Sequence, residues 1–202
     1  MKTLSKTITG YSFDELNTFA QDKAKNCILE RERLPGFFSN DLTDELKEDF
    51  GLYHLKTFFS LSCCQGDGLC LYGTITFSEL FENPKFKKIA LKGIHHKHIQ
   101  SVYDEMPDID FIHKGRYCHK NSIDMESRFY SPTEKQEAIM EKIIDNVKSW
   151  YGTFCRKWEE NGYDYFYEIS DEEMKIICHE DDCLFTETGN LINRIEYLEL
   201  TA

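Results

Sequence analysis

The sequence predicts an α+β fold, in which an antiparallel β-sheet packs with N-terminal and C-terminal helices. Apolar residues recur three or four positions apart near both ends of the chain, as on one face of a helix, and alternate with polar residues in the middle, as in strands. The 202 residues are 41% hydrophobic and 14% aromatic, which is enough for a core although 30% are charged. No repeat or low-complexity linker divides the chain, so we expect a single domain over residues 1–202.

Two helices are expected before the sheet. Ser12 and Glu15 have the spacing of a capping box, in which both side chains accept hydrogen bonds from backbone amides at the start of a helix. This helix should end before Pro35 and carry one apolar face, made of Leu16, Phe19, Ala20, Ala24, Cys27 and Ile28. A second, short helix is expected over residues 40–50, where Gly51 would end it. Its apolar face contains Leu42, Leu46 and Phe50.

A β-hairpin is expected next. In residues 55–61 and 69–77 the side chains follow a period of two, as on the two faces of a strand. The connection between the two segments, residues 63–68, reads Cys-Cys-Gln-Gly-Asp-Gly. Glycine permits the positive φ of a tight connection, and an aspartate can accept hydrogen bonds from neighbouring amides. Further strands are expected over residues 94–103, 109–113 and 116–129, with a turn at residues 114–115 between the last two.

Two helices are expected after the sheet. Ser131 and Glu134 have capping-box spacing, and Pro132 occupies the first helical position, where the missing N–H is tolerated. This longest helix, which could bend at Gly152, has an apolar stripe of Ile139, Ile143, Val147, Trp150, Phe154 and Trp158. A further capping box, Ser170-Asp171-Glu172-Glu173, opens the last helix, which carries Met174, Ile177 and Cys178.

The net charge of −12 is concentrated towards the C-terminus. Residues 159–187 contain eleven acidic residues and one lysine, whereas residues 85–98 contain five lysines, three histidines and no acidic residue. Because an acidic surface repels phosphate, direct binding to nucleic acid is not expected. The N-terminal residues lack the apolar segment of a secretory signal, and no run is long enough to span a membrane. We therefore expect a cytoplasmic protein with no membrane contact.

Four blocks of sequence carry a family resemblance: YSFDELNTFAQDKAKN, FFSLSCCQGDGLCLYG, KGRYCHKNSIDME and YFYEISDEEMKIICHEDDCLFTETG. In the order and spacing of these blocks the chain resembles a family of small uncharacterised proteins encoded by bacteriophages and prophages. The Gln-Gly-Asp-Gly block is the most specific, although family members commonly have an aromatic residue and Ser where this chain has Ser62, Cys63 and Cys64. The resemblance implies a phage origin, a shared fold and the cytoplasm of the host bacterium.

Accessory phage proteins of this size often disable host defence, so we expect a noncatalytic protein that binds and inhibits a host macromolecule. The expected target is a defence-system protein with a basic, nucleic-acid-binding groove, which would make the chain an anti-CRISPR or other anti-defence inhibitor. The expected partner-binding carboxylates are Asp171, Glu172 and Glu173. Aromatic residues beside charges are typical of interfaces, which adds Tyr163, Tyr165 and Tyr167. The acidic run could also be a solvated helix face or a nucleic-acid mimic.

A small enzyme that uses Asp67 and His119 is the alternative from a different class. The known nucleotide-binding and metalloprotease motifs do not occur in the sequence. A motif whose role as a turn or a site stays open is formed by Gln65, Gly66, Asp67, Gly68, Tyr117 and His119.

Cysteine and histidine residues are numerous enough to raise the question of a metal site. The candidate ligands are Cys118, His119, Cys178, His179 and Cys183, with a separate cluster of His95, His96 and His98. On the strand expected over residues 94–103, His96 and His98 would share one face. The paired cysteines that are typical of zinc sites do not occur in the sequence, so neither a metal nor another cofactor is expected.

Overall fold

The computed structural model describes residues 8–100, 102, 107–127 and 132–192. It confirms the predicted α+β class, because an antiparallel four-stranded sheet lies between N-terminal and C-terminal helices in the order of the chain. Contacts divide the chain into two compact units, one of residues 36–162 and one of the residues up to 35 and from 163. The expectation of a single domain stays a prediction, and each unit is described by itself.

The sheet lies within residues 36–162. Its strands β1 (Leu55–Ser60), β2 (Gly68–Ile75), β3 (Ile109–His113) and β4 (Ile123–Ser127) are neighbours in chain order. Leu55 pairs with Gly73 and Ser60 with Gly68, which confirms the predicted hairpin. Ile109 of β3 pairs with Ser127 of β4. Among the described strands, β1 and β4 are therefore the edges of the sheet.

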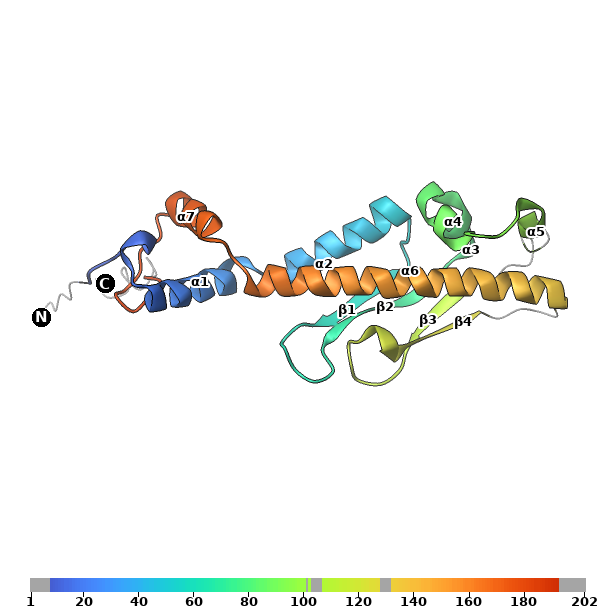
Figure 1. Ribbon diagram of the computed structural model, residues 1–202, viewed down its shortest axis with the longest axis horizontal. Coiled ribbons are helices and arrows are strands. Elements are labelled where there is room, and N and C mark those ends of the chain that lie inside the picture. The colour runs from blue at the N-terminus through green and yellow to red at the C-terminus, as the bar shows by residue number, and fades with distance from the viewer. Residues whose placement is uncertain (1–7, 101, 103–106, 128–131, 193–202) are drawn as a thin grey trace, which may run out of the picture. The chain divides into compact units, whose positions relative to one another are not determined.

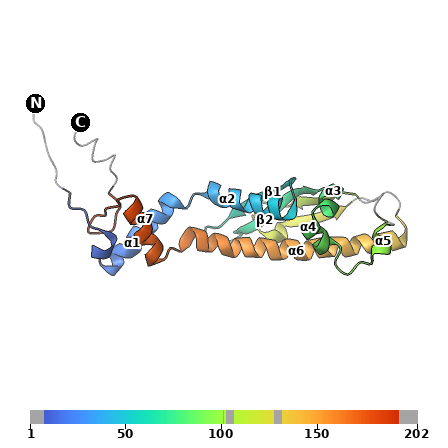
Figure 2. The same ribbon diagram turned by 90° about the horizontal axis from the view of Figure 1, so that it is seen from above.

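Helix α6 (Glu134–Tyr167) runs alongside the strands (Figure 1), and the view from above shows the same arrangement (Figure 2). Its predicted stripe is buried from Ile139 to Trp158, and the helix continues through Gly152. The ring of Phe111 on β3 lies 5.6 Å from that of Tyr151 on α6, so α6 packs on one face of the sheet. Ser131 lies outside the described residues. The described cap is Thr133, whose amide and hydroxyl both donate to the side chain of Gln136.

The helix expected over residues 40–50 begins earlier. It consists of α2 (Pro35–Asp44) and a π-helical turn (Glu45–Asp49). The helix can begin at Pro35 because proline is tolerated in the first turn of a helix. Its predicted apolar face is buried: Leu42, Leu46 and Phe50. Gly51 follows with φ +68°, as a glycine that ends a helix does.

The strand expected over residues 94–103 is wrong. The structure has a helical turn there, α5 (His96–Gln100), with the rings of His95 and His98 three positions and 6.1 Å apart. A common strand face for His96 and His98 therefore does not exist. The last expected strand begins only at Ile123, after a 3-10 turn over Lys120–Ser122, and its final residues lie outside the described part.

Two helices before α5 were not expected, α3 (Phe77–Glu82) and α4 (Pro84–Ala90). Their caps were visible in the sequence. Thr76 and Glu79 form a capping box, and the side chain of Asn83 accepts hydrogen bonds from two amides at the start of α4.

The other unit contains α1 (Thr18–Glu32) and α7 (Asp171–Glu180). The Ser12–Glu15 capping box forms, but it caps a 3-10 turn (Phe13–Glu15), while Asn17 caps α1. Phe19, expected on the apolar face, is 79% exposed because Ala20, Ala24 and Ile28 form the buried stripe and Phe19 is rotated by about 100° from it. Ser170 accepts a hydrogen bond from the amide of Glu173, which is one half of the predicted capping box, while the side chain of Glu173 pairs with Arg33.

Candidate functional site

Two loops meet at one end of the sheet, the β1–β2 loop with the Gln-Gly-Asp-Gly sequence and the β3–β4 loop (Figure 1). A Cβ atom on Gly66 would lie 2.0 Å from Cδ1 of Tyr117, so the tyrosine ring lies directly on the glycine backbone. A Cβ atom on Gly68 would lie 3.2 Å from Cδ2 of His119. The structure thus brings together two parts of the predicted motif that lie far apart in the sequence.

Asp67 holds the β1–β2 loop in shape. Its Oδ1 accepts a hydrogen bond from the hydroxyl of Ser60 at 2.7 Å, and its Oδ2 accepts from the amides of Ser62 and Cys64 at 2.7 and 2.6 Å. The amide of Cys64 and the hydroxyl of Ser60 lower the pKa of Asp67, because they stabilise the ionised carboxylate. Both carboxylate oxygens of Asp67 therefore stabilise the turn.

His119 has a comparable local role. Its Nδ1 accepts a hydrogen bond from the amide of Asn121 at 3.1 Å and so caps the 3-10 turn of the β3–β4 loop. Beside it, Tyr117 remains 42% exposed and receives a hydrogen bond from Arg116 at 3.0 Å, while Gln65 is exposed on the facing loop. In the motif, hydrogen bonds of Asp67 and His119 thus stabilise two turns, and Gln65 and Tyr117 are exposed.

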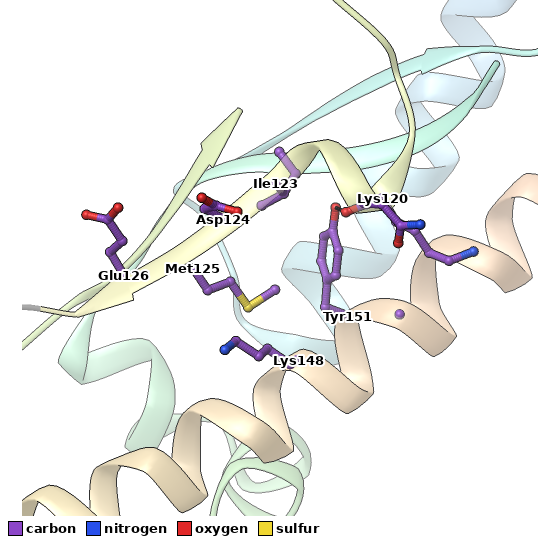
Figure 3. Close-up of a pocket in the computed structure, with 9 residues that line it drawn as sticks. Lys120, Ile123, Asp124, Met125, Glu126, Lys148 and Tyr151 are labelled. Carbon is purple, nitrogen blue, oxygen red and sulfur yellow. Dashed lines mark hydrogen bonds between the residues drawn. The ribbon is translucent and has the colours of Figure 1, made fainter. Parts of the chain in front are cut away.

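A hollow of about 480 Å³ adjoins the β3–β4 loop, between edge strand β4 and helix α6 (Figure 3). Its lining consists of Lys120, Asn121, Ile123, Asp124, Met125, Glu126, Lys148, Tyr151 and Gly152. A second hollow of about 610 Å³ shares three of these residues and extends along the same two elements. It adds Ser127, Glu141, Ile144 and Asp145. We call the two hollows together the β4–α6 groove.

The floor of the β4–α6 groove is apolar and its rim is charged. Met125 points towards Lys148 and Tyr151, whereas Asp124 and Glu126 point away from α6 (Figure 3). Tyr151 donates a hydrogen bond to the carbonyl of Lys120 at 3.2 Å, and burial raises its pKa, so the phenol stays neutral. Apart from Asp124 and Glu126, the charged residues of the lining are two carboxylates, Glu141 and Asp145, and two lysines, Lys120 and Lys148.

Gly152 leaves the groove open on the side of α6. No atom lies within 4 Å of the position that its Cβ would take. Glycine inside a helix costs roughly 1 kcal/mol relative to alanine. The sequence reasoning did not find this groove, although a glycine in the middle of a long helix was a usable signal.

The acidic residues expected to bind a partner lie in the other unit, where helix α1 and the residue after it supply opposite charges. Asp171 forms an ion pair with Lys25 at 2.5 Å, and Glu173 forms one with Arg33. Lys25 lowers the pKa of Asp171. Glu172, between them, is exposed.

The three expected tyrosines differ in exposure and contacts. The ring of Tyr165 lies 5.1 Å from the guanidinium of Arg33, and its hydroxyl donates to the carbonyl of Leu34 at 3.4 Å. The rings of Tyr163 and Tyr167 stack at 6.1 Å, and Tyr167 is 49% exposed. Of the six predicted partner-binding residues, Glu172 and Tyr167 are thus the best placed to meet a partner.

Metal binding and membrane insertion depend on side-chain clusters and on long apolar helices. Within the described residues, no group of three or more Cys, His, Asp or Glu side chains is placed to hold a metal ion. In α7, burial raises the pKa of Cys178 to about 12. In the same part of the chain, no helix has the length and apolar character needed to cross a membrane. The expectations of no metal and no cofactor stay predictions.

The fold and the groove define an α+β protein in which a sheet edge lies beside a long helix and has no partner strand among the described residues. Residues 45–171, more than half of the chain, match the model of a family described as Domain of unknown function (DUF8835), and the chain belongs to this family. The matched residues contain the whole sheet and every residue of the β4–α6 groove. Searches of the curated proteins and of the solved structures found no match.

Proposed function

We propose that this chain is a noncatalytic binding protein whose β4–α6 groove takes a basic segment of a partner protein. The observation that carries the proposal is the composition of the groove, which combines half-buried Met125 and Ile144 with the exposed carboxylates Glu141 and Asp145 on the α6 wall. An apolar centre with a charged rim is the usual composition of a protein interface. The apolar floor supplies contact area, and the carboxylates select a basic partner and speed its association.

The identity of the partner is proposed from the sequence resemblance. Proteins encoded by phages and prophages act in the cytoplasm of the host bacterium, and defence proteins that bind nucleic acid present basic surfaces to it. A carboxylate-rimmed groove suits such a surface by charge. The proposed role is therefore inhibition of a host defence protein, with a CRISPR system as the first to test.

The alternatives have less support. In the acidic segment of residues 159–187, Asp171 already pairs with Lys25 of α1 and Glu173 with Arg33 just after that helix, which leaves fewer carboxylates for a partner or for imitating nucleic acid. An enzyme that uses Asp67 and His119 would need the Asp67 carboxylate for substrate or proton transfer, yet both of its oxygens accept hydrogen bonds from the loop.

Phage plating tests the proposal. The chain is expressed in bacteria whose CRISPR system targets a phage, and the phage should regain its ability to form plaques. Replacing the groove carboxylates, Glu141→Lys with Asp145→Lys, should abolish this effect. The control Glu160→Lys, an exposed carboxylate elsewhere on α6, should not abolish it. Full activity of the groove variant, with unchanged circular dichroism, would place the interface elsewhere.

A further inference from the structure

We propose that the segment bound in the β4–α6 groove is an extended strand that pairs with β4 as a fifth strand of the sheet, an inference that rests on the proposed function. Within the described residues, β4 pairs with β3 alone. The outer edge of such a strand presents a row of backbone N–H and C=O groups that can pair with another chain. Peptide recognition by strand addition uses these groups for affinity.

A strip of the α6 surface beside β4 is not covered by the sheet. Ile143 and Val147 are buried, whereas the neighbouring Ile144 is only half-buried and lines the groove beside β4. A strand placed about 4.8 Å from β4, the usual spacing, would lie over this uncovered strip of the helix. The missing side chain of Gly152 leaves room for it. An added strand would therefore cover the apolar strip as well as pair with the edge.

The lengths of the two groove walls agree with each other. The five residues of β4 extend roughly 17 Å as a strand. Residues 141–152, which form the α6 wall, extend roughly 18 Å, at about 1.5 Å per residue. The groove thus accommodates an extended segment of about five residues along its whole length.

The charges indicate the sequence of the added strand. Side chains of neighbouring strands that share a face interact directly. On the groove side they would meet Met125, Ile144 and Tyr151, which favours apolar residues. On the other side they would lie next to Asp124, which already forms an ion pair with Lys114, and next to Glu126, which is the carboxylate that favours lysine or arginine. A segment that alternates apolar and basic residues satisfies both sides.

The same charges disfavour a second copy of this chain as the occupant. An antiparallel pair of two β4 strands centred on Met125 would place Asp124 opposite Glu126 of the second copy. Like charges directly opposite destabilise a sheet, and the ion pair of Asp124 with Lys114 reduces this cost without removing the charge of Glu126. We therefore assign the groove to a strand of a different protein.

Defined peptides test the strand pairing on the full chain. The probe is a fluorescently labelled peptide of about seven residues that alternates valine and lysine, and binding is measured by fluorescence anisotropy. It should bind, and a valine–glutamate peptide should bind at least about tenfold more weakly. In a paired strand only alternate amides face the neighbour. Methylating the backbone nitrogens of one alternate set should therefore abolish binding, and methylating the other set should weaken it far less.

Two substitutions at Gly152 locate the site. Gly152→Leu should fill the groove and weaken peptide binding by at least about tenfold, whereas the matched control Gly152→Ala should stay within about twofold of the parent. Both variants should keep the helix, because leucine and alanine are better helix formers than glycine. Equal binding by the two variants would overturn the assignment to this groove.

The outcomes separate the strand inference from the proposed function. If both methylated peptides bind like the parent peptide, strand pairing is wrong, while binding of a basic segment stands. If no peptide binds, or if the free chain forms a dimer that excludes the peptide, the added strand is also wrong, and the phage assay alone decides the proposed function. If the chain binds the peptide but does not restore plaques, the strand inference stands and the proposed defence target is contradicted.

Discussion

At the scale of single residues, the contact between Gly66 and Tyr117 joins the two hairpin loops. The ring occupies the position that any larger side chain at residue 66 would need, and Gly66 has φ +92°. Asp67 next to it accepts three hydrogen bonds from its own loop. These residues explain why the loop contains Gly-Asp-Gly without assigning it any chemistry.

Replacing Gly66 by alanine should lower the free energy of unfolding by about 2–4 kcal/mol, because the new Cβ would collide with Tyr117 in a backbone conformation that alanine disfavours. Gly115→Ala is the matched control, since Gly115 has nearly the same φ of +93° but no atom within 4 Å of its Cβ position. Urea unfolding measures both. Equal losses would show that the contact with Tyr117 contributes nothing.

The Asp67 carboxylate should make stability depend on pH. Its pKa is lowered in the folded chain, so its contribution is present above the unfolded pKa of about 3.9 and is lost as the pH falls through the folded pKa. Asp67→Asn removes the charge. The difference in unfolding free energy between parent and variant should therefore be larger at about pH 7 than at about pH 2. A difference that does not change with pH would contradict this role.

At the scale of elements, sequence periodicity predicted the structures with long apolar patterns. The hairpin and the stripe from Ile139 to Trp158 follow from alternation and helical spacing. The prediction of a strand over residues 94–103 was wrong, because a short segment with few apolar residues can fit a helix or a strand equally well. Helix α3 was missed although the Thr76–Glu79 cap was visible. The groove was not predicted, because it forms only where the edge of β4 meets α6, and Gly152 inside the long helix was only a local signal for it.

Two glycines of α6 should respond in opposite directions to the same change. Gly152→Ala should raise the free energy of unfolding by about 1 kcal/mol, since the helix gains a better former and the new Cβ meets no atom within 4 Å. Gly162→Ala should lower it, because its Cβ would lie 2.3 Å from Cδ1 of Leu61 and 2.9 Å from Cζ of Phe38. Thermal unfolding of both variants is the measurement. A loss of stability in Gly152→Ala would mean that the groove is not open at this position.

At the scale of the whole molecule, the two units carry different kinds of acidic surface. In the unit with α1 and α7, Asp171 and Glu173 pair with cations from a distant part of the sequence. Counting charges along residues 159–187 could not reveal this, because Lys25 and Arg33 lie more than a hundred residues earlier. In residues 36–162 the exposed carboxylates Glu141 and Asp145 line the β4–α6 groove, which lies inside the matched family region.

Charge reversal on α7 distinguishes a structural ion pair from a binding surface. Glu173→Lys should lower the melting temperature because it places a cation beside Arg33, whereas Glu172→Lys changes the net charge equally at an exposed position and should not. Calorimetry of the two variants measures this. Unchanged melting in both, together with equal loss of plaque rescue, would make the acidic segment the interface.

Amide hydrogen exchange of the free and peptide-bound chain tests the central claim most directly, because it reports which backbone groups become protected. With the valine–lysine peptide bound, exchange should slow at alternate amides of residues 123–127, the outer edge of β4, and stay unchanged in α7. Bound peptide that leaves residues 123–127 unprotected, or that protects residues 171–180 instead, would contradict strand addition in the β4–α6 groove.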